Sequence, residues 1–466
     1  MYTRFSSSVL FPLHERLKGH HSVALRRELE QTQWWTRERI EALQVQQLRA
    51  FLSAAREHVG YYRDAFANAG FDPRDLSDIA DLRKLPFLTK ELIRANTDAL
   101  TSVIAGKLIR YSTGGSSGEP LTFYMGLNRV SHDVAAKWRA TRWWNVDIGD
   151  PEVVLWGSPI EIGKQDRIKT IRDLLFRSHL FPAFQMSPAQ MDRFLDRLEW
   201  LRPKMLFGYA SALALLAEHG SSRRRDMGKI GVQVTFATGE TLYPDQREVI
   251  ERVFQAPVAN GYGSRDAGFI AHECPSGAMH LSAEHIIVEL VGPDGNPTPP
   301  GEQGEIVTTH LATGDFPFIR YRTGDVACFA TEPCRCGRGL PVLREVLGRA
   351  TDFIRTPSGD VMHALALIYE VRDKAGVRAF KFIQADDLSV ELLLVASNEL
   401  TYVVEDEIRR GVLSRLGSGA VLKLRRVDEI SPEKSGKYRY VVSHAARSKP
   451  SVSRLADSRC ERTQGQ

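Results

Sequence analysis

The chain has 466 residues, of which 43% are hydrophobic and 26% are charged. A chain of this length is longer than those that usually fold around a single hydrophobic core, which predicts two or more domains. The composition is typical of a soluble globular protein. The formal net charge of +5, from 62 basic and 57 acidic residues, is too small to indicate a nucleic-acid-binding protein.

Targeting and cysteine content indicate the compartment. Charges interrupt the short apolar pieces of residues 1–19, so we expect no secretory signal there. We also expect no membrane span, because no window reaches the apolar length that a bilayer requires. Five cysteines are few and odd in number, which suits a reducing environment without a disulfide framework. The prediction is a cytoplasmic protein.

The first half of the chain predicts helices and then an alternating pattern. Apolar residues recur at spacings of three or four from about residue 22 to 70, residues 130–144 have the pattern of another helix, and residues 151–157 that of a buried strand and turn. Expected strands and helices then alternate at 191–200 (helix), 204–208 (strand), 211–218 (helix), 232–238 (strand), 245–254 (helix) and 258–262 (strand). This alternation predicts a parallel sheet covered by helices, with ligands at the carboxyl ends of the strands.

The pattern changes after about residue 275. Expected strands at 285–290, 305–310 and 325–329 are joined by Gly- and Pro-rich turns, which predicts an antiparallel, barrel-like piece. A small α+β unit follows, with helices at 364–372 and 401–416 and strands at 379–384, 389–395 and 421–427. The predicted organisation is an α/β large domain (1–347), a hinge (348–352), a smaller α+β C-terminal domain (353–446) and a disordered basic tail (447–466).

One segment has a composition that neither a core strand nor a helix favours. Three glycines and four hydroxyl side chains lie in seven consecutive residues, Ser112, Thr113, Gly114, Gly115, Ser116, Ser117 and Gly118. Glycine lets the backbone approach a ligand closely, and successive N–H groups with hydroxyl donors suit an anion. The segment is either a loop that holds nucleotide phosphates or a flexible linker or hairpin turn.

Six segments, taken in order, resemble the motifs of the adenylate-forming (AMP-binding) superfamily. They are Ser112–Pro120 (the phosphate-binding loop TSGTTGKP), Thr238–Glu240 (the adenine-binding turn), Tyr262–Asp266 (YGxTE), Tyr321–Asp325 (YRTGD), Leu347–Asp352 (the GRxDD hinge) and Lys434–Lys437 (SGK). The chain looks most like the phenylacetate–CoA ligase and CapK branch, by residues 202–213, the Cys-rich residues 334–338 and the short C-terminal domain.

The resemblance implies an enzyme that attacks the α-phosphate of ATP with a carboxylate and forms an acyl-adenylate. It implies the adenylate-forming fold, ATP and Mg²⁺ as requirements, and an acid–thiol ligase activity. It also implies site residues. Residues 112–118 would enclose the phosphates, and the residues around the nucleotide would be Thr238, Gly239, Glu240, Gly263 and Ser264. Tyr262 would stack on adenine, Asp325 would bind the ribose, and Asp266 would hold Mg²⁺. Arg349 would lie near the ribose and phosphate, and Lys437 would reach the carboxylate and the α-phosphate.

The acid and its acceptor stay open at this point. Trp156, Phe207, Tyr209, Phe236 and Phe269 could line an aromatic-sized pocket for a small carboxylic acid or could belong to the core. Coenzyme A is the expected acceptor, with a carrier-protein thiol or an amine as alternatives. The oligomeric state is also open, a homodimer included.

The sequence departs from the family pattern at three positions, and two of these departures, Glu119 and Thr351, favour a rival interpretation. Glu119 stands where Lys is common, Asp266 where Glu is usual, and Thr351 where the first hinge acid is expected. The rival is a CapK-like nucleotide-binding protein in polysaccharide or secondary-metabolite assembly, with another acceptor or no catalysis. The YRTGD segment and Lys437 oppose it.

A second constellation predicts a metal. Cys274, His280, Cys334 and Cys336 offer three thiolates and an imidazole, a closed tetrahedral set suited to structural Zn²⁺. Their spacing is not that of a standard zinc finger, and His272 is a competing ligand. The alternative is a buried thiol beside a surface histidine. A zinc ion there would fix the residue 270–285 loop to the barrel-like piece.

Overall fold

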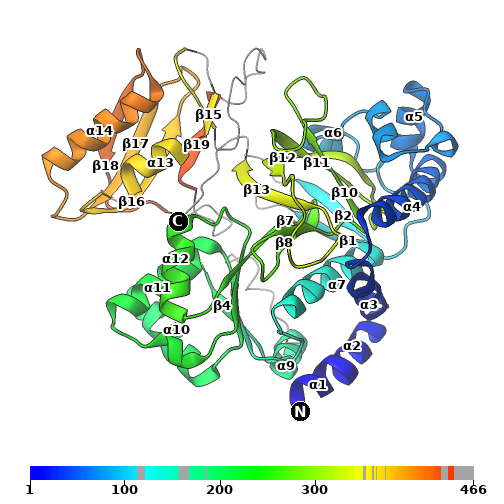
Figure 1. Ribbon diagram of the computed structural model, residues 1–466, viewed down its shortest axis with the longest axis horizontal. Helices are drawn as coiled ribbons and strands as arrows, with labels where there is room; N and C mark the ends of the chain where they lie inside the picture. Colours follow the sequence, from blue (N-terminus) through cyan, green and yellow to red (C-terminus); the bar gives the residue numbers. More distant parts are fainter. Residues whose placement is uncertain are drawn as a thin grey trace.

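The computed structural model describes residues 1–112, 121–156, 167–183, 186–349, 353–358, 361–363, 365–372, 374–431 and 439–445. Its largest element is one eleven-stranded mixed sheet, and a separate four-stranded sheet forms the C-terminal part (Figure 1).

The N-terminal region is helical, as expected from its periodicity. Its elements are α1 (Tyr2–Phe5), the π-helical turn η1 (Ser6–Leu10), α2 (Phe11–Leu17), α3 (Ser22–Thr32), α4 (Arg37–His58), α5 (Gly60–Asn68), the 3₁₀ turns η2 (Pro73–Asp75) and η3 (Ile79–Lys84), and α6 (Lys90–Ala95). Helix α4 begins where the Thr36 hydroxyl accepts a hydrogen bond from the Arg39 amide, and it buries Ile40, Leu48 and Leu52 against the main core. This region therefore packs on the sheet by one apolar helix face.

One half of the main sheet is parallel. It contains β3 (Glu152–Trp156), β4 (Ser178–Pro182), β5 (Met205–Gly208), β6 (Val234–Thr238) and β7 (Val258–Ser264), with α9 (Arg167–Leu175), α10 (Pro188–Leu201), α11 (Ala210–Ser222), η4 (Met227–Ile230) and α12 (Pro244–Phe254) between them. Helices α10, α11 and α12 bury Phe194, Leu213 and Ile250 in a second core with these strands. The expected strand–helix alternation is present. Strand β4 was not expected, because this edge strand is only half-buried and ends in Pro182.

The other half of the sheet is antiparallel. Strands β8 (Gly268–Glu273), β9 (Met279–Leu281), β10 (Ile286–Val291), β11 (Gln303–His310), β12 (Phe318–Phe329) and β13 (Val342–Arg349) continue the sheet in the order β10-β11-β12-β13-β9-β8-β7. The expected antiparallel strands are there, but they do not form a barrel-like unit of their own. Pairing of β7 with β8 joins them to the parallel strands, because the chain reverses tightly after Ser264.

Two further elements complete the large part. The hairpin of β1 (Ile109–Ser112) and β2 (Thr122–Met125) forms a small separate sheet, and α7 (Leu127–Trp143) follows it. Helix α7 is buried along most of its length, including the charged Arg129 and Arg139, because it lies between α3 and the sheet.

The C-terminal part has its own α+β core. It comprises β14 (Phe353–Arg355), β15 (Val361–His363), α13 (Leu365–Arg372), β16 (Val377–Gln384), β17 (Val390–Ala396), α14 (Tyr402–Leu416), β18 (Leu422–Arg426) and β19 (Val441–Ser443), with sheet order β18-β17-β16-β19. Phe382, Leu392 and Ile408 are among its fully buried residues. Arg372 forms an ion pair with Asp245 of α12 at 2.6 Å, and the rings of Tyr243 and Tyr440 meet edge to face, so this part contacts the large one beside α12.

Candidate functional site

The ends of the glycine-rich segment lie on a hairpin. Ser112 closes β1 and pairs in register with Thr122 of β2. Thr113, Gly114, Gly115, Ser116, Ser117, Gly118 and Glu119 lie outside the described residues. The Arg265 guanidinium donates a hydrogen bond to the carbonyl of Ser112 at 3.3 Å. The base of this loop is therefore tied to the turn after β7, 153 residues away in sequence.

That turn is joined to the YRTGD segment by two tyrosines. The hydroxyl of Tyr262 donates to a carboxylate oxygen of Asp325 at 2.8 Å, and the hydroxyl of Tyr321 donates to Asp266 at 2.5 Å. Ser264 donates to the other oxygen of Asp266 and accepts a bond from the amide of Ala267. Two segments that sequence comparison treats as separate motifs thus form one hydrogen-bonded unit.

The electrostatics of this unit favour a carboxylate at Asp266. Its side chain is buried, which alone would raise its pKa, but the positive charge of Lys90 and the hydrogen bonds from Ser264 and Tyr321 outweigh burial and lower the pKa. Burial raises the pKa of Tyr262 well above its usual value, and the negative charge of Asp325 is the next largest cause of this rise. The pair Tyr262–Asp325 is therefore a neutral phenol bonded to a carboxylate.

Asp325 lies opposite Arg349 on the neighbouring strand. The two residues are register partners in the antiparallel pair β12–β13. Gly324 has a φ of +79° just before Asp325, and the Asp325 amide donates to the Thr323 hydroxyl at 3.1 Å. The side chain of Arg349 lies outside the described residues, as do Lys437 and residues 350–352 of the predicted hinge.

The turn after β6 is crowded by aromatic rings. Gly239 has a φ of +79°, and a Cβ there would lie 3.1 Å from the ring of Tyr209 and 3.2 Å from that of Trp156. These two rings stack on each other at 4.2 Å. Thr238 donates to the carbonyl of Gly261 at 2.6 Å, which joins the ends of β6 and β7. Only glycine fits this turn without displacing the stacked pair.

The resemblance places Glu240 beside the nucleotide, but its side chain contacts a helix. Its carboxylate accepts a hydrogen bond from the Ser211 amide at 3.0 Å, in the first turn of α11. A carboxylate at this end of a helix is stabilised by free N–H groups and by the helix dipole. In this arrangement the Glu240 side chain supports α11, although its backbone remains part of the turn after β6.

Sequence reasoning missed three charged or polar contributors. Arg129, fully buried on α7, donates to the carbonyls of Arg265 and Asp266 at 3.1 Å each and pairs with Asp133. Lys90, at the start of α6, acts on Asp266 through its charge. Tyr321 belongs to a recognised motif, but its bond to Asp266 carries no sequence signal. Burial of Arg129 and the approach of Lys90 come from tertiary packing, which a single sequence does not show.

An apolar pocket adjoins the Thr238 turn. It is lined by Lys137, Thr141, Phe207, Phe236, Thr238, Gly261, Phe269 and His272. Of the five aromatic candidates, Phe207, Phe236 and Phe269 line it, whereas Trp156 and Tyr209 stack on each other beside Gly239. The Lys137 ammonium lies 4.2 Å from the ring centre of Phe207, and burial lowers the pKa of His272 to about 3, so this imidazole is neutral.

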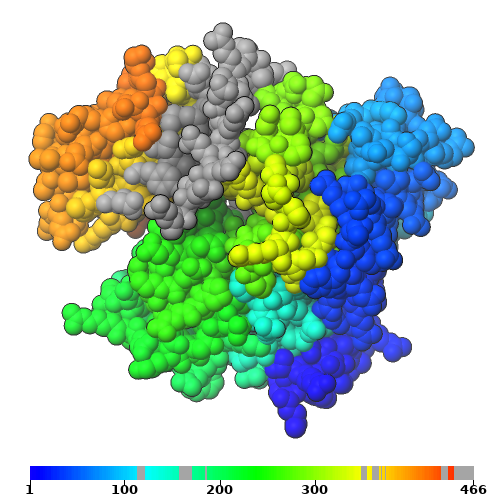
Figure 2. All heavy atoms as spheres, viewed as in Figure 1, coloured from blue at the N-terminus to red at the C-terminus, as the bar shows by residue number. Residues whose placement is uncertain are grey.

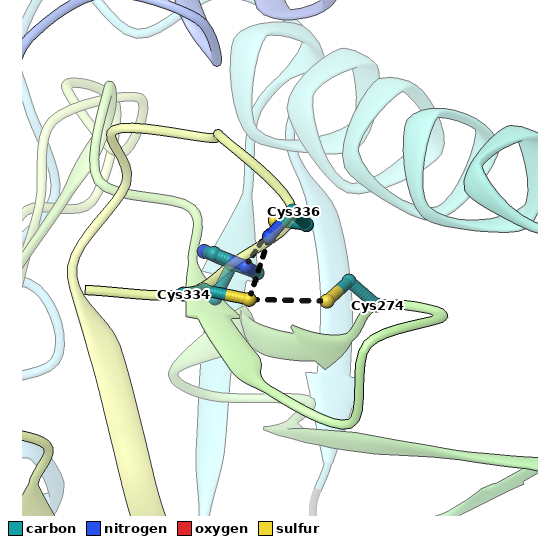
Figure 3. Close-up of side chains that lie close together, drawn as sticks. Cys274, Cys334 and Cys336 are labelled. Atoms are coloured by element: carbon teal, nitrogen blue, oxygen red, sulfur yellow. Dashed lines mark hydrogen bonds between the residues drawn. The ribbon is translucent and has the colours of Figure 1, made fainter. Parts of the chain in front are cut away.

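The four predicted metal ligands lie together. The ligand atoms of Cys274, His280, Cys334 and Cys336 are all within 4.8 Å of one another. The sulfurs of Cys274 and Cys334 are 3.8 Å apart, and the Cys336 sulfur is 3.2 Å from His280 Nε2. Figure 3 shows the sulfurs of Cys274 and Cys334 facing each other from two segments, with Cys336 beside them on the same loop as Cys334. Nδ1 of His280 lies 3.2 Å from the carbonyl of Leu340 and can donate to it, which leaves Nε2 for the cluster.

The competing ligand is not in this cluster. His272 pairs in register with His280 across β8 and β9, but its ring stacks on Phe269 and lines the apolar pocket. The cluster and the pocket thus meet on one pair of strands. Three thiols and one imidazole nitrogen at these separations suit a four-coordinate Zn²⁺ after small shifts to bond distances of about 2.0–2.3 Å.

Comparison with known proteins identifies the architecture. Residues 354–444 match the model of the CapK C-terminal domain. A solved 2-hydroxyisobutyryl-CoA ligase in its postadenylation state superposes with a TM-score of 0.71 at 21% identity, covering 87% of this chain and 90% of that one. The chain has the adenylate-forming ligase fold.

Two curated relatives agree with the branch that the motifs indicate. Protein CapK of Staphylococcus aureus is 22% identical over 406 residues, which is 86% of this chain and 89% of CapK. A phenylacetate-coenzyme A ligase of Escherichia coli is 27% identical over 68% of this chain and 72% of its own length. The expected resemblance to the phenylacetate–CoA ligase and CapK branch is confirmed. Among the described residues, no helix is both long and apolar enough to cross a bilayer.

Proposed function

We propose that this protein is an ATP-dependent, AMP-forming acid–thiol ligase. It activates a small carboxylic acid as an acyl-adenylate and then transfers the acyl group to coenzyme A. The observation that carries the proposal is the hydrogen-bonded unit in which Tyr262 meets Asp325 and Tyr321 meets Asp266. The relatives that are named as CoA ligases support it.

The proposed first step is attack of the acid's carboxylate oxygen on the α-phosphorus of ATP, with loss of pyrophosphate. Two anions must approach, so the site needs cationic groups and N–H donors directed at the phosphates. We assign residues 112–118 to the phosphates, Tyr262 and the Thr238–Glu240 turn to the base, Asp325 to the ribose, and Arg349 and Lys437 to the phosphate and the reacting carboxylate. In the second step a thiolate attacks the acyl carbon and AMP leaves.

Asp266 is the proposed Mg²⁺ ligand. Its depressed pKa keeps it a carboxylate, the kind of oxygen ligand that Mg²⁺ prefers. Ser264 and Tyr321 each bond one of its oxygens, and each oxygen has a second lone pair for a cation. The ion, when bound, would neutralise charge on the phosphates. Arg129 and Lys90 are proposed to position the turn and to hold the carboxylate ionised.

The acid is proposed to be small, with a single ring or a short chain. The pocket lined by Phe207, Phe236 and Phe269 is filled by its own side chains and leaves no free space even for a water molecule, so an acid could enter only if it is small and these rings move aside. The neighbouring Lys137 and His272 favour an acid whose far end accepts a hydrogen bond, because His272 Nε2 is buried without a partner among the described residues.

A second candidate differs in the acceptor. The match to CapK spans 86% of the chain and includes the C-terminal domain, whereas the phenylacetate-coenzyme A ligase of E. coli matches 68%. Acyl transfer to a carrier-protein thiol or an amine, or nucleotide binding without catalysis, is therefore the alternative. We also propose that the protein can form a homodimer.

We further propose that the Cys274–His280–Cys334–Cys336 cluster holds a structural Zn²⁺, and that residues 348–352 are a hinge about which the C-terminal domain turns between the two steps. Four protein ligands leave no open position, so the ion would take no part in the reaction. The four described cysteines are all free thiols, which supports a reducing, cytoplasmic compartment.

The test is pyrophosphate release by the purified protein with ATP and Mg²⁺, over a panel of small aryl and aliphatic acids, each with and without coenzyme A. We expect release with one class of acid and stimulation by coenzyme A. The variant Lys437→Ala should abolish most of this release, a loss of about 3–4 kcal/mol of transition-state stabilisation, while Lys434→Ala serves as its neighbouring control. Nucleotide binding without release for any acid would favour the non-catalytic alternative.

A further inference from the structure

A row of exposed apolar side chains runs along the first two helices. Tyr2, Phe5, Val9, Leu13 and Leu17 recur at spacings of three and four, and between 40% and 80% of each is exposed. The helical segments α1, η1 and α2 follow one another without a break, so these residues share one face. A soluble helix normally buries such a face.

The opposite face of the same helices is firmly packed. Phe11 is buried and meets the ring of Trp138 edge to face at 4.9 Å and that of Phe176 at 5.6 Å. Glu15 is buried and bonded to His20 and Ser22. The exposed row is therefore held in place by a core on its far side and is not the disordered end of a chain.

A neighbouring helix extends the apolar surface. The hydroxyl of Tyr2 donates to the carbonyl of Leu175 at 2.6 Å, which sets α1 beside α9. Helix α9 exposes Ile171, Leu174 and Leu175. Eight of the seventeen large apolar side chains that are exposed in the described part of the chain lie on α1–α2 and α9. Figures 1 and 2 show these helices at one corner, where the N-terminus projects from the body.

The exposed charge around this surface is positive. Arg4 and Arg16 are exposed on the same helices, and the exposed Lys18 directly follows α2. The acids nearby are engaged: Glu15 is buried, Asp173 pairs with Arg172, and Asp150 pairs with Lys204. An apolar face with an aromatic end and a basic border is the pattern of a helix that lies in the interface of a membrane.

We propose that the face formed by α1–α2 and α9 binds the surface of an anionic lipid bilayer, with the helices parallel to the membrane plane. Charge complementarity selects this occupant over a second copy of the chain. Two copies meeting through this face would bring basic borders of the same sign together, which disfavours the contact, whereas anionic headgroups attract them. The proposal does not depend on the reaction that the enzyme carries out.

The experiment is flotation of the full chain with vesicles of phosphatidylcholine alone and of phosphatidylcholine with phosphatidylglycerol. We expect binding to the anionic vesicles that weakens as salt is added. The triple variant Phe5→Ser, Val9→Ser, Leu13→Ser should lower partitioning by at least about tenfold, as should Arg4→Glu with Arg16→Glu and Lys18→Glu. The matched control is Trp200→Ser, Tyr402→Ser, Val403→Ser, which removes exposed apolar groups from α10 and α14 and should bind as the parent does.

Three outcomes would overturn the proposal. One is absence of binding to either kind of vesicle. The second is an equal loss of vesicle binding in the control variant. The third is a dimer, measured by sedimentation velocity, that the Phe5→Ser, Val9→Ser, Leu13→Ser variant dissociates while vesicles are not bound. The circular dichroism spectrum and the thermal unfolding midpoint without vesicles should be the same in all variants, which shows that each one is folded.

Discussion

The phenol of Tyr321 donates a 2.5 Å hydrogen bond to the carboxylate of Asp266, across 55 residues of sequence. Because Tyr321 is fully buried on β12, the position of this carboxylate depends on the sheet and not on the turn alone. The position of the proposed Mg²⁺ ligand is thus tied to a buried residue of the main sheet.

We expect Tyr321→Phe to weaken adenylation without unfolding the protein. The substitution keeps the ring and removes one hydrogen bond to a charged group, a loss of about 1.5–3 kcal/mol. Pyrophosphate release should fall by a comparable factor, and the Mg²⁺ concentration for half-maximal rate should rise. Tyr402→Phe, on the exposed surface of α14, is the control. An unchanged Mg²⁺ requirement would contradict a role for Tyr321 through Asp266.

The same variant predicts a change with pH. The pKa of Asp266 is lowered in the folded protein, so its contribution to stability is present above the unfolded pKa and is lost as pH falls through the folded value. Without the Tyr321 hydroxyl the folded pKa rises. The acid limb of the rate profile should therefore move to higher pH in Tyr321→Phe.

Lys90 gives a second test of the same carboxylate. Its charge helps to lower the pKa of Asp266. Lys90→Met should raise that pKa and slow pyrophosphate release, with the loss greatest at low pH. Lys84→Met removes an exposed lysine that pairs with Asp81 and should have little effect. Equal rates for the two variants at every pH would exclude Lys90 from the site.

A matched pair of glycines tests the aromatic crowding near Gly239. Gly239→Ala and Gly231→Ala place a side chain at nearly the same φ, +79° and +80°, but only the first would meet the rings of Tyr209 and Trp156. Both should lose about 1 kcal/mol of stability from backbone strain. We expect an additional loss of ATP affinity in Gly239→Ala alone, measured by calorimetric titration. Equal ATP affinities in the two variants would remove this turn from the nucleotide site.

Metal analysis tests the cysteine cluster. The purified protein should contain zinc, and Cys334→Ser and His280→Ala should lose it together with thermal stability, because metal binding and folding are coupled. Cys328→Ser changes a buried cysteine outside the cluster and should retain the metal. The site would be disproved if the parent protein, prepared in the presence of added zinc, contained no zinc and was still fully stable.

The contact between the two parts of the chain gives a fifth prediction. Asp245→Asn removes the charge that pairs with Arg372, a contribution of about 0–1 kcal/mol. Stability should change little. If this contact favours one domain orientation, the ratio of thioester formation to pyrophosphate release should shift in the variant. Arg410→Gln, which breaks an exposed pair with Asp406 inside α14, should leave the ratio unchanged.

The sequence predicts the strand–helix alternation, and the fold that its motifs resemble is confirmed. It does not predict that β8 pairs with β7, because pairing between strands depends on which edges meet in space, and so one sheet replaces the expected barrel-like piece. It points to Cys274, His280, Cys334 and Cys336 by residue type alone. It misses Arg129 and Lys90, since a buried arginine and a solvated one have the same local pattern. The side chain of Glu240 shows the same limit, because helix capping depends on a partner 29 residues away.

The paired strands β7 and β8 carry residues that we assign to different parts of the proposed site. Under the proposed function, Tyr262 on β7 would contact the nucleotide, whereas Phe269 and His272 on β8 line the apolar pocket proposed for the acid. Substitutions at Phe269 and His272 would then change the proposed acid pocket and leave the Tyr262–Asp325 hydrogen bond in place. On that proposal, a change of acid specificity could begin with substitutions on β8 alone.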